Sequence, residues 1–305
     1  MIYRKIILAG GNGYLGGLLA QHFSALAEEV IILSRSLQAA KGNIKTVLWN
    51  GKTEGKWRKQ LENADLLVNL CGKNVNCRYT PKNREEIINS RVIPTRLLGK
   101  TIIGLTNPPK LWINITSATI YRHAEDRPQD EYTGQIGDGF SVDVCKAWES
   151  SFFESETPQT RKVALRMGIV LGKTDSAFPR LLNLVRFGLG GKQGSGRQYV
   201  NWVHEQDAVR TIEWLLNNDS ISGVVNCTSP HAVTNKVLMR AIRKAYGIGF
   251  GLPAPEWLLA IGARIIGTET ELILKSRWVK PAVLLEHGFG FKHATIDDAV
   301  QEILG

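Results

Sequence analysis

A glycine-rich segment near the N-terminus has the residue types and the spacing that bind the phosphates of a dinucleotide. It runs Gly10-Gly11-Asn12-Gly13-Tyr14-Leu15-Gly16 and directly follows a short apolar run. Gly10 and Gly13 let the backbone turn tightly and approach a pyrophosphate, and Gly16 lets the next helix pack closely on the strand. The free amides at the start of that helix attract phosphate oxygens. The segment predicts a dinucleotide cofactor, with contacts at Gly10, Asn12, Gly13, Tyr14, Leu15 and Gly16.

The residues at the end of the second predicted strand indicate which dinucleotide binds. An NAD-selective site places an acidic residue there, about 20 residues beyond the loop, to bind the ribose 2′-hydroxyl. This chain has Ser34-Arg35-Ser36 instead, and a guanidinium and hydroxyls would hold a 2′-phosphate. One charge-assisted contact contributes on the order of 1.5–3 kcal/mol, so Arg35 would favour NADP over NAD roughly ten- to a hundredfold. We therefore expect NADP(H) as the cofactor, with Ser34 and Arg35 as contacts.

The fourth predicted strand supplies further cofactor contacts. We expect the side chain of Asp65 and the strand end Asn69-Leu70-Cys71-Gly72 to face the adenine and the ribose. The predicted contacts from this strand end are Leu70, Cys71 and Gly72.

Alternating strands and helices must position these residues. The strands that we predict are Lys5–Ala9, Val30–Ser34, Lys45–Leu48, Leu66–Leu70, Leu111–Thr116 and Val163–Gly168, and the helices include Gly16–Ala27, Arg84–Ile103 and Val142–Glu154. The strands are rich in Val, Ile and Leu with little polar alternation, which is typical of strands buried on both faces. The pattern predicts an α/β fold of the NAD(P)-binding Rossmann type with a doubly wound parallel sheet.

The rhythm changes after about residue 172. A helix over Phe178–Gly188, a glycine-rich loop over 190–196 and a helix after Thr234 predict a smaller, mostly helical lobe. The strand Val224–Cys227 is expected to rejoin the sheet. We therefore expect a Rossmann domain over residues 1–172, completed by about 212–235, and a substrate or C-terminal lobe over 173–211 and 236–305.

Composition and charge exclude several classes of protein. The 305 residues are 43% hydrophobic and 22% charged, which is ordinary for a globular protein. The apolar run Trp257–Ala263 is far shorter than a membrane span and predicts a buried helix. The run after Arg4 and Lys5 is too short for a signal peptide, so we expect a cytoplasmic protein without membrane association.

The cysteines and the net charge indicate which metals and binding partners to expect. The four cysteines, Cys71, Cys77, Cys145 and Cys227, have no CxxC spacing and no histidine cluster, so we expect reduced thiols and no metal site. The net charge of +10 comes from scattered basic residues without a basic helix, which argues against nucleic acid. It is compatible with a small anionic substrate, and equally with an ordinary basic surface.

The chain resembles a known family along its whole length. The spacing Gly10-x-x-Gly13-x-x-Gly16 resembles that of extended short-chain dehydrogenases/reductases. The match continues through Asn69–Val75, Ile88–Val92, Thr116–Tyr121, Val144–Glu149, Leu165–Gly172, Gly188–Gly191, Gly194–Gln198, Trp202–Asp207 and Pro281–Phe289. The chain is similar to the atypical extended group known as epimerase family proteins, whose bacterial members carry a distinctive C-terminal domain. The resemblance implies a Rossmann fold, NADP binding and an unspecified activity.

The resemblance also assigns the catalytic positions. In extended short-chain dehydrogenases a serine binds the substrate oxygen, a tyrosinate moves its proton, and a lysine four residues later binds the nicotinamide ribose. The serine and lysine positions match Ser117 and Lys146, but the tyrosine position is Val142, which has no proton to move. The atypical group also tends to lack this tyrosine. Another acid such as Asp143, Tyr121 or a bound water could replace it, or the reaction could need little proton assistance, or the protein could bind NADP without turnover.

Several residues are expected at the mouth of the sheet, where ligands bind. They are Asn74, Arg78, Arg91, Arg166, Arg197 and Trp202, of which Asn74, Arg197 and Trp202 are our candidate substrate contacts. Arg197 could hold a phosphate or carboxylate, although a surface role is equally plausible. His204 and Asp207 resemble a paired acid and base, although this stretch more often begins a structural helix in the family.

Two functional hypotheses follow from these residues. The first is an NADP-dependent oxidoreductase or epimerase that acts on a small polar substrate. The alternative is a non-catalytic NADP(H)-binding sensor or regulatory protein. By analogy with the family, a homodimer could form through the helices predicted at Arg84–Ile103 and Val142–Glu154.

Overall fold

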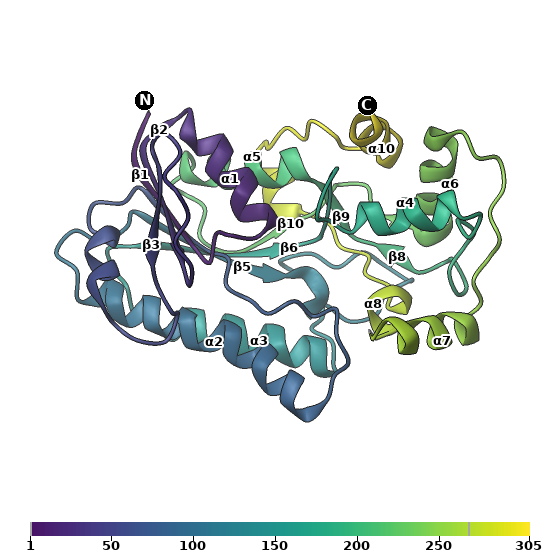
Figure 1. Cartoon of the computed structure of the whole chain (residues 1–305), viewed down its shortest axis with the longest axis horizontal. Coiled ribbons are helices and arrows are strands. Elements are labelled where there is room, and N and C mark those ends of the chain that lie inside the picture. The colour runs from purple at the N-terminus through teal and green to yellow at the C-terminus, as the bar shows by residue number, and fades with distance from the viewer. Residues whose placement is uncertain (1, 268) are drawn as a thin grey trace.

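A seven-stranded parallel sheet forms the centre of the molecule (Figure 1). The computed structural model describes residues 2–267 and 269–305. The strand order is β10-β6-β5-β4-β1-β2-β3. The strands are β1 Tyr3–Ala9, β2 Ala27–Ser34, β3 Ile44–Leu48, β4 Leu66–Asn69, β5 Leu111–Ser117, β6 Arg161–Met167 and β10 Gly223–Cys227. The predicted doubly wound Rossmann sheet is confirmed, and β10 rejoins it as expected.

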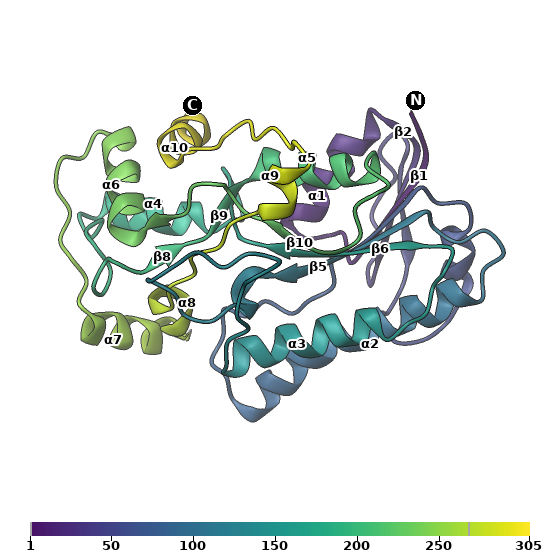
Figure 2. The same cartoon turned by 180° about the vertical axis from the view of Figure 1, so that it is seen from behind.

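Helices cover both faces of this sheet, as Figures 1 and 2 show. Helices α1 (Tyr14–Ser24) and α5 (Glu205–Leu216) lie on one face, and α2 (Pro81–Ile103) and α3 (Phe140–Phe153) lie on the other. The first layer buries Phe23 and Ile212 against the strands, and the second buries Leu98 and Phe152. Because both faces are covered, the strands can be almost wholly apolar.

The order of the strands creates the expected ligand crevice. Strand β1 pairs with β2 on one side and with β4 on the other, so the connections from these strands leave in opposite directions. Dinucleotides bind outside the carboxyl ends of the strands at such a switch point. The residues that follow β1, β2 and β4 are Gly10, Arg35 and Leu70, which places three of the predicted cofactor segments at one edge.

The remaining elements form a region at the opposite end of the molecule from β3 (Figure 1). It contains helices α4 Phe178–Arg186, α6 Asn235–Tyr246, α7 Glu256–Ile266, α8 Glu271–Leu274 and α10 Ile296–Leu304. Two small sheets join it to the rest of the chain: β7 Ile169–Leu171 with β9 Trp202–His204, and β8 Tyr199–Val200 with β11 Val233–Thr234. Helix α9 (Ala282–Glu286) packs near β10, and short 3₁₀-helices occur at η1 Lys56–Leu61 and η2 Ala118–Ile120. The domain division at residue 172 stays a prediction.

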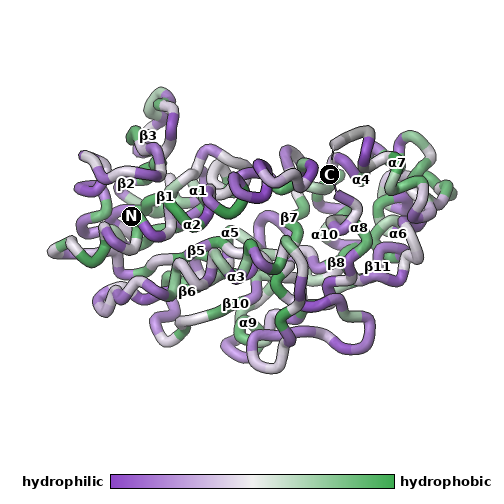
Figure 3. The backbone as a smooth tube through the Cα atoms, turned by 90° about the horizontal axis from the view of Figure 1, so that it is seen from below, coloured by the Kyte–Doolittle hydropathy of each residue, from purple (hydrophilic) through white to green (hydrophobic). Residues whose placement is uncertain are grey.

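Helix α7 differs from its expectation. A helix forms over the predicted apolar run, but Trp257, Leu258 and Ile261 are 65%, 40% and 51% exposed. The run was expected to be buried, and this expectation is wrong, because α7 lies at the outer edge of the C-terminal region (Figure 1). Figure 3 shows a hydrophobic stretch at α7, separate from the one at β1 in the sheet. The apolar character of this run therefore did not predict whether its side chains would be buried.

None of the helices within residues 2–267 and 269–305 is both long and apolar enough to cross a membrane. All four cysteines are free thiols, of which Cys145 and Cys227 are buried and Cys71 and Cys77 are half-buried. The expectation of reduced cysteines is compatible with this arrangement.

Candidate cofactor and active site

The glycine loop has the geometry that a phosphate-binding turn requires. Gly10 has a φ of +75°, and a Cβ there would lie 2.8 Å from the Cys71 Sγ atom. A Cβ at Gly16 would overlap the backbone of Gly11. Gly13 directly precedes α1, and no atom lies within 4 Å of where its Cβ would be. Gly10 and Gly16 thus permit close packing within the protein, whereas Gly13 leaves open space beside the first amides of α1.

The end of β2 is tied directly to this loop. The Asn12 side-chain amide donates to the Ser34 hydroxyl and, at 3.5 Å, to the Ser36 hydroxyl. Ser34 is largely buried, and Arg35 beside it is exposed. One amide, two hydroxyls and one guanidinium therefore gather beside the glycine loop. Such groups suit a dianionic phosphate, and none of residues 34–36 is acidic.

The end of β4 completes the cofactor edge. The Gly10 amide donates to the Leu33 carbonyl and the Leu70 amide to the Ala9 carbonyl, both at 2.8 Å. Burial raises the pKa of the Cys71 thiol to about 12, although the positive charges of Arg35 and Arg91 act in the opposite direction. The structure therefore brings together the loop Gly10–Gly16, Ser34 with Arg35, and Leu70-Cys71-Gly72.

Asp65 does not belong to this edge. It precedes β4, so it lies at the amino end of the strand, away from the glycine loop. Its carboxylate accepts hydrogen bonds from the amides of Arg4 and Lys5 and pairs with Lys110 at 2.7 Å. The expectation that Asp65 faces the adenine is wrong, because parallel strands present one end of the sheet to the ligand and Asp65 lies at the other.

Ser117 and Lys146 take the places that the family resemblance predicts in the chain. Ser117 ends β5 and is half-buried, and its hydroxyl accepts from the Thr119 amide at 3.2 Å. It therefore caps the turn η2, a structural role that leaves the hydroxyl partly accessible. Lys146 lies on α3 and is exposed, away from the ion pairs found among the described residues.

The position where the family has its catalytic tyrosine is buried and has no access to solvent. Val142 is fully buried in an apolar cluster with Ala118, Ile120, Tyr121, Cys145 and Val279. Val279 comes from the C-terminal region, between α8 and α9. Valine therefore fills the space between α3 and the C-terminal segment.

Tyr121 is held in a buried polar network. Its hydroxyl donates to Asn226 Oδ1 at 3.1 Å and accepts from Arg166 Nη1 at 2.9 Å, and the residue is 1% exposed. Burial raises the pKa of this phenol, while Arg166 and Asn226 oppose the rise. The structure therefore argues against Tyr121 as the substitute acid. The other side-chain candidate, Asp143, is exposed on the first turn of α3.

The candidate substrate residues differ in their exposure to solvent. Trp202 is fully buried in the core of the C-terminal region, with its indole N–H donating to the His231 carbonyl at 3.3 Å. Because β9 turns this side chain inward, its burial argues against a substrate contact, which stays a prediction. Asn74 is exposed and closes a local turn with Asn76 at 2.8 Å. The exposed Arg197 lies 3.9 Å from Glu125, and the substrate roles of Asn74 and Arg197 both stay predictions.

His204 and Asp207 hold the C-terminal segment in place. Asp207 is fully buried and accepts from the amides of Lys292 and His293 at 2.8 Å each. His204 is also fully buried, and its Nδ1 accepts from the Gln206 amide at 3.2 Å. The neutral ring then carries its proton on Nε2, which lies 2.9 Å from Glu302. This tautomer favours a contact with the carboxylate over metal coordination, so neither residue supports the acid–base pair considered from the sequence.

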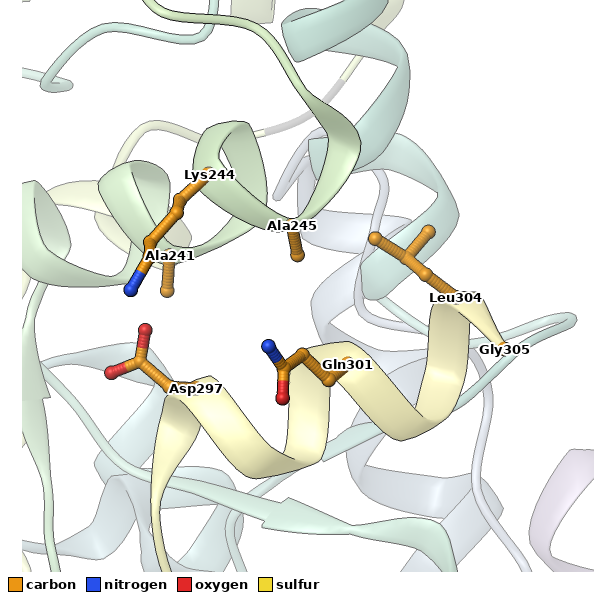
Figure 4. Close-up of a pocket in the computed structure, with 7 residues that line it drawn as sticks. All are labelled: Ala241, Lys244, Ala245, Asp297, Gln301, Leu304 and Gly305. Atoms are coloured by element: carbon orange, nitrogen blue, oxygen red, sulfur yellow. The ribbon is translucent and has the colours of Figure 1, made fainter.

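Two cavities in the described structure lie away from the glycine loop. A groove of about 410 Å³ between α6 and α10 is lined by Lys244, Asp297, Gln301 and small or apolar side chains (Figure 4). A second, of about 380 Å³, surrounds Asp65 and Asn107 at the amino ends of the strands. Neither of these two cavities includes the glycine loop.

Sequence patterns did not indicate one half-buried carboxylate near the cofactor loop, whose Oε2 atom is buried. Glu205 is the first residue of α5, and its Oε2 lies beside the Tyr14 hydroxyl at Gly172. An acidic residue in the first turn of a helix is so common that its type and position gave no signal.

The comparisons with known proteins agree with this geometry. The description "NAD dependent epimerase/dehydratase family" matches residues 6–228, and a domain of unknown function, DUF1731, matches residues 254–303. The Bacillus subtilis epimerase family protein YfhF is 29% identical, covering 98% of each chain. The human epimerase family protein SDR39U1 is 29% identical over 98% of this chain and 99% of its own. A crystal structure of that human protein (isoform 2), determined with NADPH, has a TM-score of 0.86 at 28% identity and covers 98% of both chains.

The first match covers well over half of the chain and spans the sheet from β1 to β10. The relatives match along nearly their full lengths and confirm the resemblance to epimerase family proteins. This chain belongs to the NAD dependent epimerase/dehydratase family.

Proposed function

We propose that this protein is an NADP(H)-dependent oxidoreductase or epimerase of the atypical extended short-chain dehydrogenase type. The observation that carries the proposal is the link between Asn12 and Ser34, which places the exposed Arg35 beside the glycine loop. A 2′-phosphate would meet hydroxyls and a guanidinium there. The solved human relative binds NADPH, which supports the same choice.

The residues present fit such a cofactor. The open space beside Gly13 and the first amides of α1 would receive the pyrophosphate. Leu70, Cys71 and Gly72 would line the adenosine side, and Lys146 would reach the nicotinamide ribose. The cofactor would supply a hydride acceptor or donor, and the protein would supply orientation and electrostatics.

The catalytic roles follow from access to solvent. We assign Ser117 to the substrate oxygen, since its hydroxyl is half-buried at the end of β5. Val142 cannot transfer a proton, and Tyr121 is held by Arg166 and Asn226. We therefore assign the proton step to a water molecule admitted at Ser117. The substrate would be a small polar molecule, and the positive net charge favours an anionic one.

The alternative is a non-catalytic NADP(H) sensor. It would need only the cofactor edge and would leave Ser117 and Lys146 without a role. Its support is the valine at position 142, and no contact among the described residues favours it over an enzyme.

Two measurements test the proposal. A crystal structure with NADPH should place the nicotinamide beside Ser117 and Lys146. Lys146→Ala should raise the NADPH Kd about tenfold, the equivalent of one charge-assisted contact. Lys244→Ala is the matched control, because Lys244 is an exposed helical lysine at the α6–α10 groove. An unchanged Kd in Lys146→Ala would contradict the ribose role.

A further inference from the structure

Two oxygen atoms from different helices converge at Gly172. A Cβ at this position would overlap both the Tyr14 hydroxyl oxygen and Glu205 Oε2. Tyr14 opens α1 and Glu205 opens α5, and these helices pack against each other on one face of the sheet. Because both oxygens lie within 2 Å of the same Cβ position, they are next to each other.

Both oxygens are buried, and neither has a hydrogen-bond partner in the described structure. Leaving a buried polar group unsatisfied is costly, so two such groups side by side favour a direct bond. A modest rotation of either side chain would align them. The pairing also explains the glycine, since any side chain at position 172 would separate the two oxygens.

The surroundings of Glu205 favour its neutral form. Burial raises the pKa of this carboxyl, the negative charge of Glu302 raises it further, and the backbone N–H of Lys173 opposes the rise. The charged group that acts on it is Glu302 on α10, and His204 precedes it in the chain at the end of β9. Burial lowers the pKa of His204, so this ring offers no positive charge near neutral pH.

We infer that Tyr14 and Glu205 form a hydrogen bond across Gly172 that positions the glycine loop, and that NADP(H) binding is coupled to protonation of Glu205. This inference rests on the proposed function. The backbone of Tyr14 belongs to the turn that would receive the pyrophosphate. A carboxylate held by its side chain would add negative charge near that site, and a protonated carboxyl would not.

The sign of the effect follows from this geometry. Bound phosphates favour the neutral form of Glu205 and raise its pKa further, so binding takes up a proton. Affinity is therefore highest at low pH and falls as the pH rises through the Glu205 pKa. We expect a loss of about fivefold, the size of a screened charge–charge interaction.

The test is calorimetric titration of NADP⁺ between about pH 5.5 and pH 9, in buffers of different ionisation enthalpy that report proton uptake. The variants are Glu205→Gln and Tyr14→Phe. The matched controls are Glu286→Gln and Tyr132→Phe, because Tyr132 donates to Glu286 at 2.7 Å in an exposed pair elsewhere. The 2′-phosphate itself titrates near about pH 6, so each variant is compared with the unmodified protein.

We expect Glu205→Gln to remove the fivefold pH-dependent loss and its share of proton uptake, and Tyr14→Phe to weaken binding several-fold. Both controls should behave like the unmodified protein. If Glu205→Gln keeps the full pH dependence and proton uptake, the inference is overturned while NADP(H) binding stands. If the unmodified protein binds no NADP⁺ or NADPH at any pH, the proposed function itself fails.

Discussion

Arg166 donates two charge-assisted hydrogen bonds to Glu149, from Nε to Oε1 at 2.8 Å and from Nη2 to Oε2 at 2.7 Å. Both residues are buried between β6 and α3. Burial disfavours a charged guanidinium, but the Glu149 carboxylate more than offsets this effect and raises the pKa of Arg166. The pair therefore fixes α3, and with it Val142 and Lys146, against the sheet.

Removing Glu149 should destabilise the fold strongly. Glu149→Ala leaves Arg166 as a buried cation without its carboxylate, so the free energy of unfolding should fall by about 3–5 kcal/mol. Urea denaturation followed by tryptophan fluorescence measures this change. Glu154→Ala is the control, because Glu154 pairs with Arg96 at the exposed end of the same helix. Equal losses in both variants would show that the buried pair has no special role.

Tyr121→Phe separates a structural tyrosine from a catalytic one. The change removes the bonds to Asn226 and Arg166, so the free energy of unfolding should fall by about 1–3 kcal/mol. NADPH affinity should stay unchanged, because the hydroxyl faces the interior. The two measurements are thermal unfolding and fluorescence titration with NADPH. A variant of unchanged stability that binds NADPH much more weakly would contradict the structural role and indicate that Tyr121 acts in the active site.

Much of the fold was predictable because its determinants are local. Runs of Val, Ile and Leu predicted all seven strands of the parallel sheet to within a few residues, and glycine spacing predicted the loop. The short strands β7, β8, β9 and β11 were not predicted, since each has only two or three residues and pairs with a distant partner. Sequence periodicity carries no information on such short pairings.

Two glycines in the same loop should respond differently to alanine. Gly16→Ala forces a Cβ into the Gly11 backbone, so the melting temperature should fall, with a loss of about 1–3 kcal/mol. Gly13→Ala meets nothing within 4 Å and should leave stability unchanged. It should nevertheless weaken NADPH binding at least about tenfold, because the phosphates need that space. If Gly13→Ala binds NADPH normally, the phosphate site lies elsewhere.

Asp65 should matter for stability and not for the cofactor. Burial opposes ionisation of this carboxyl, but Lys110 and the amides of Lys5 and Arg4 outweigh it and lower its pKa. A lowered pKa in the folded state contributes stability above the unfolded pKa, and this contribution is lost as the pH falls through the folded value.

Asp65→Ala should therefore reduce the free energy of unfolding by about 1–2 kcal/mol at pH 7. The difference from the unmodified protein should shrink below about pH 4. NADPH affinity should not change, because Asp65 lies at the amino end of β4. Weaker NADPH binding in a folded Asp65→Ala protein would reinstate the adenine contact expected from the sequence.

The candidate site was less predictable than the fold, because its outcome depends on which way side chains point. Asp65 and Trp202 were placed near the ligand by their positions in the chain, but one lies at the wrong end of a strand and the other faces the core. Glu205 gained its environment from α1 and from Gly172, which are remote in sequence. The position of Ser34 beside the glycine loop was predictable because the loop-to-strand distance in this fold is nearly fixed, while the cofactor contacts of Ser34 and Arg35 stay predictions.

The most direct test of the account is the ratio of NADH and NADPH dissociation constants. The unmodified protein should bind NADPH at least about tenfold more tightly than NADH, since Arg35 and the hydroxyls of Ser34 and Ser36 recognise the 2′-phosphate. Arg35→Ala should lose most of this preference by weakening NADPH alone, and Arg186→Ala, at an exposed helix end, should keep it. Equal affinities in the unmodified protein, or an Arg35→Ala variant that loses both cofactors equally, would contradict NADP(H) selection at Arg35.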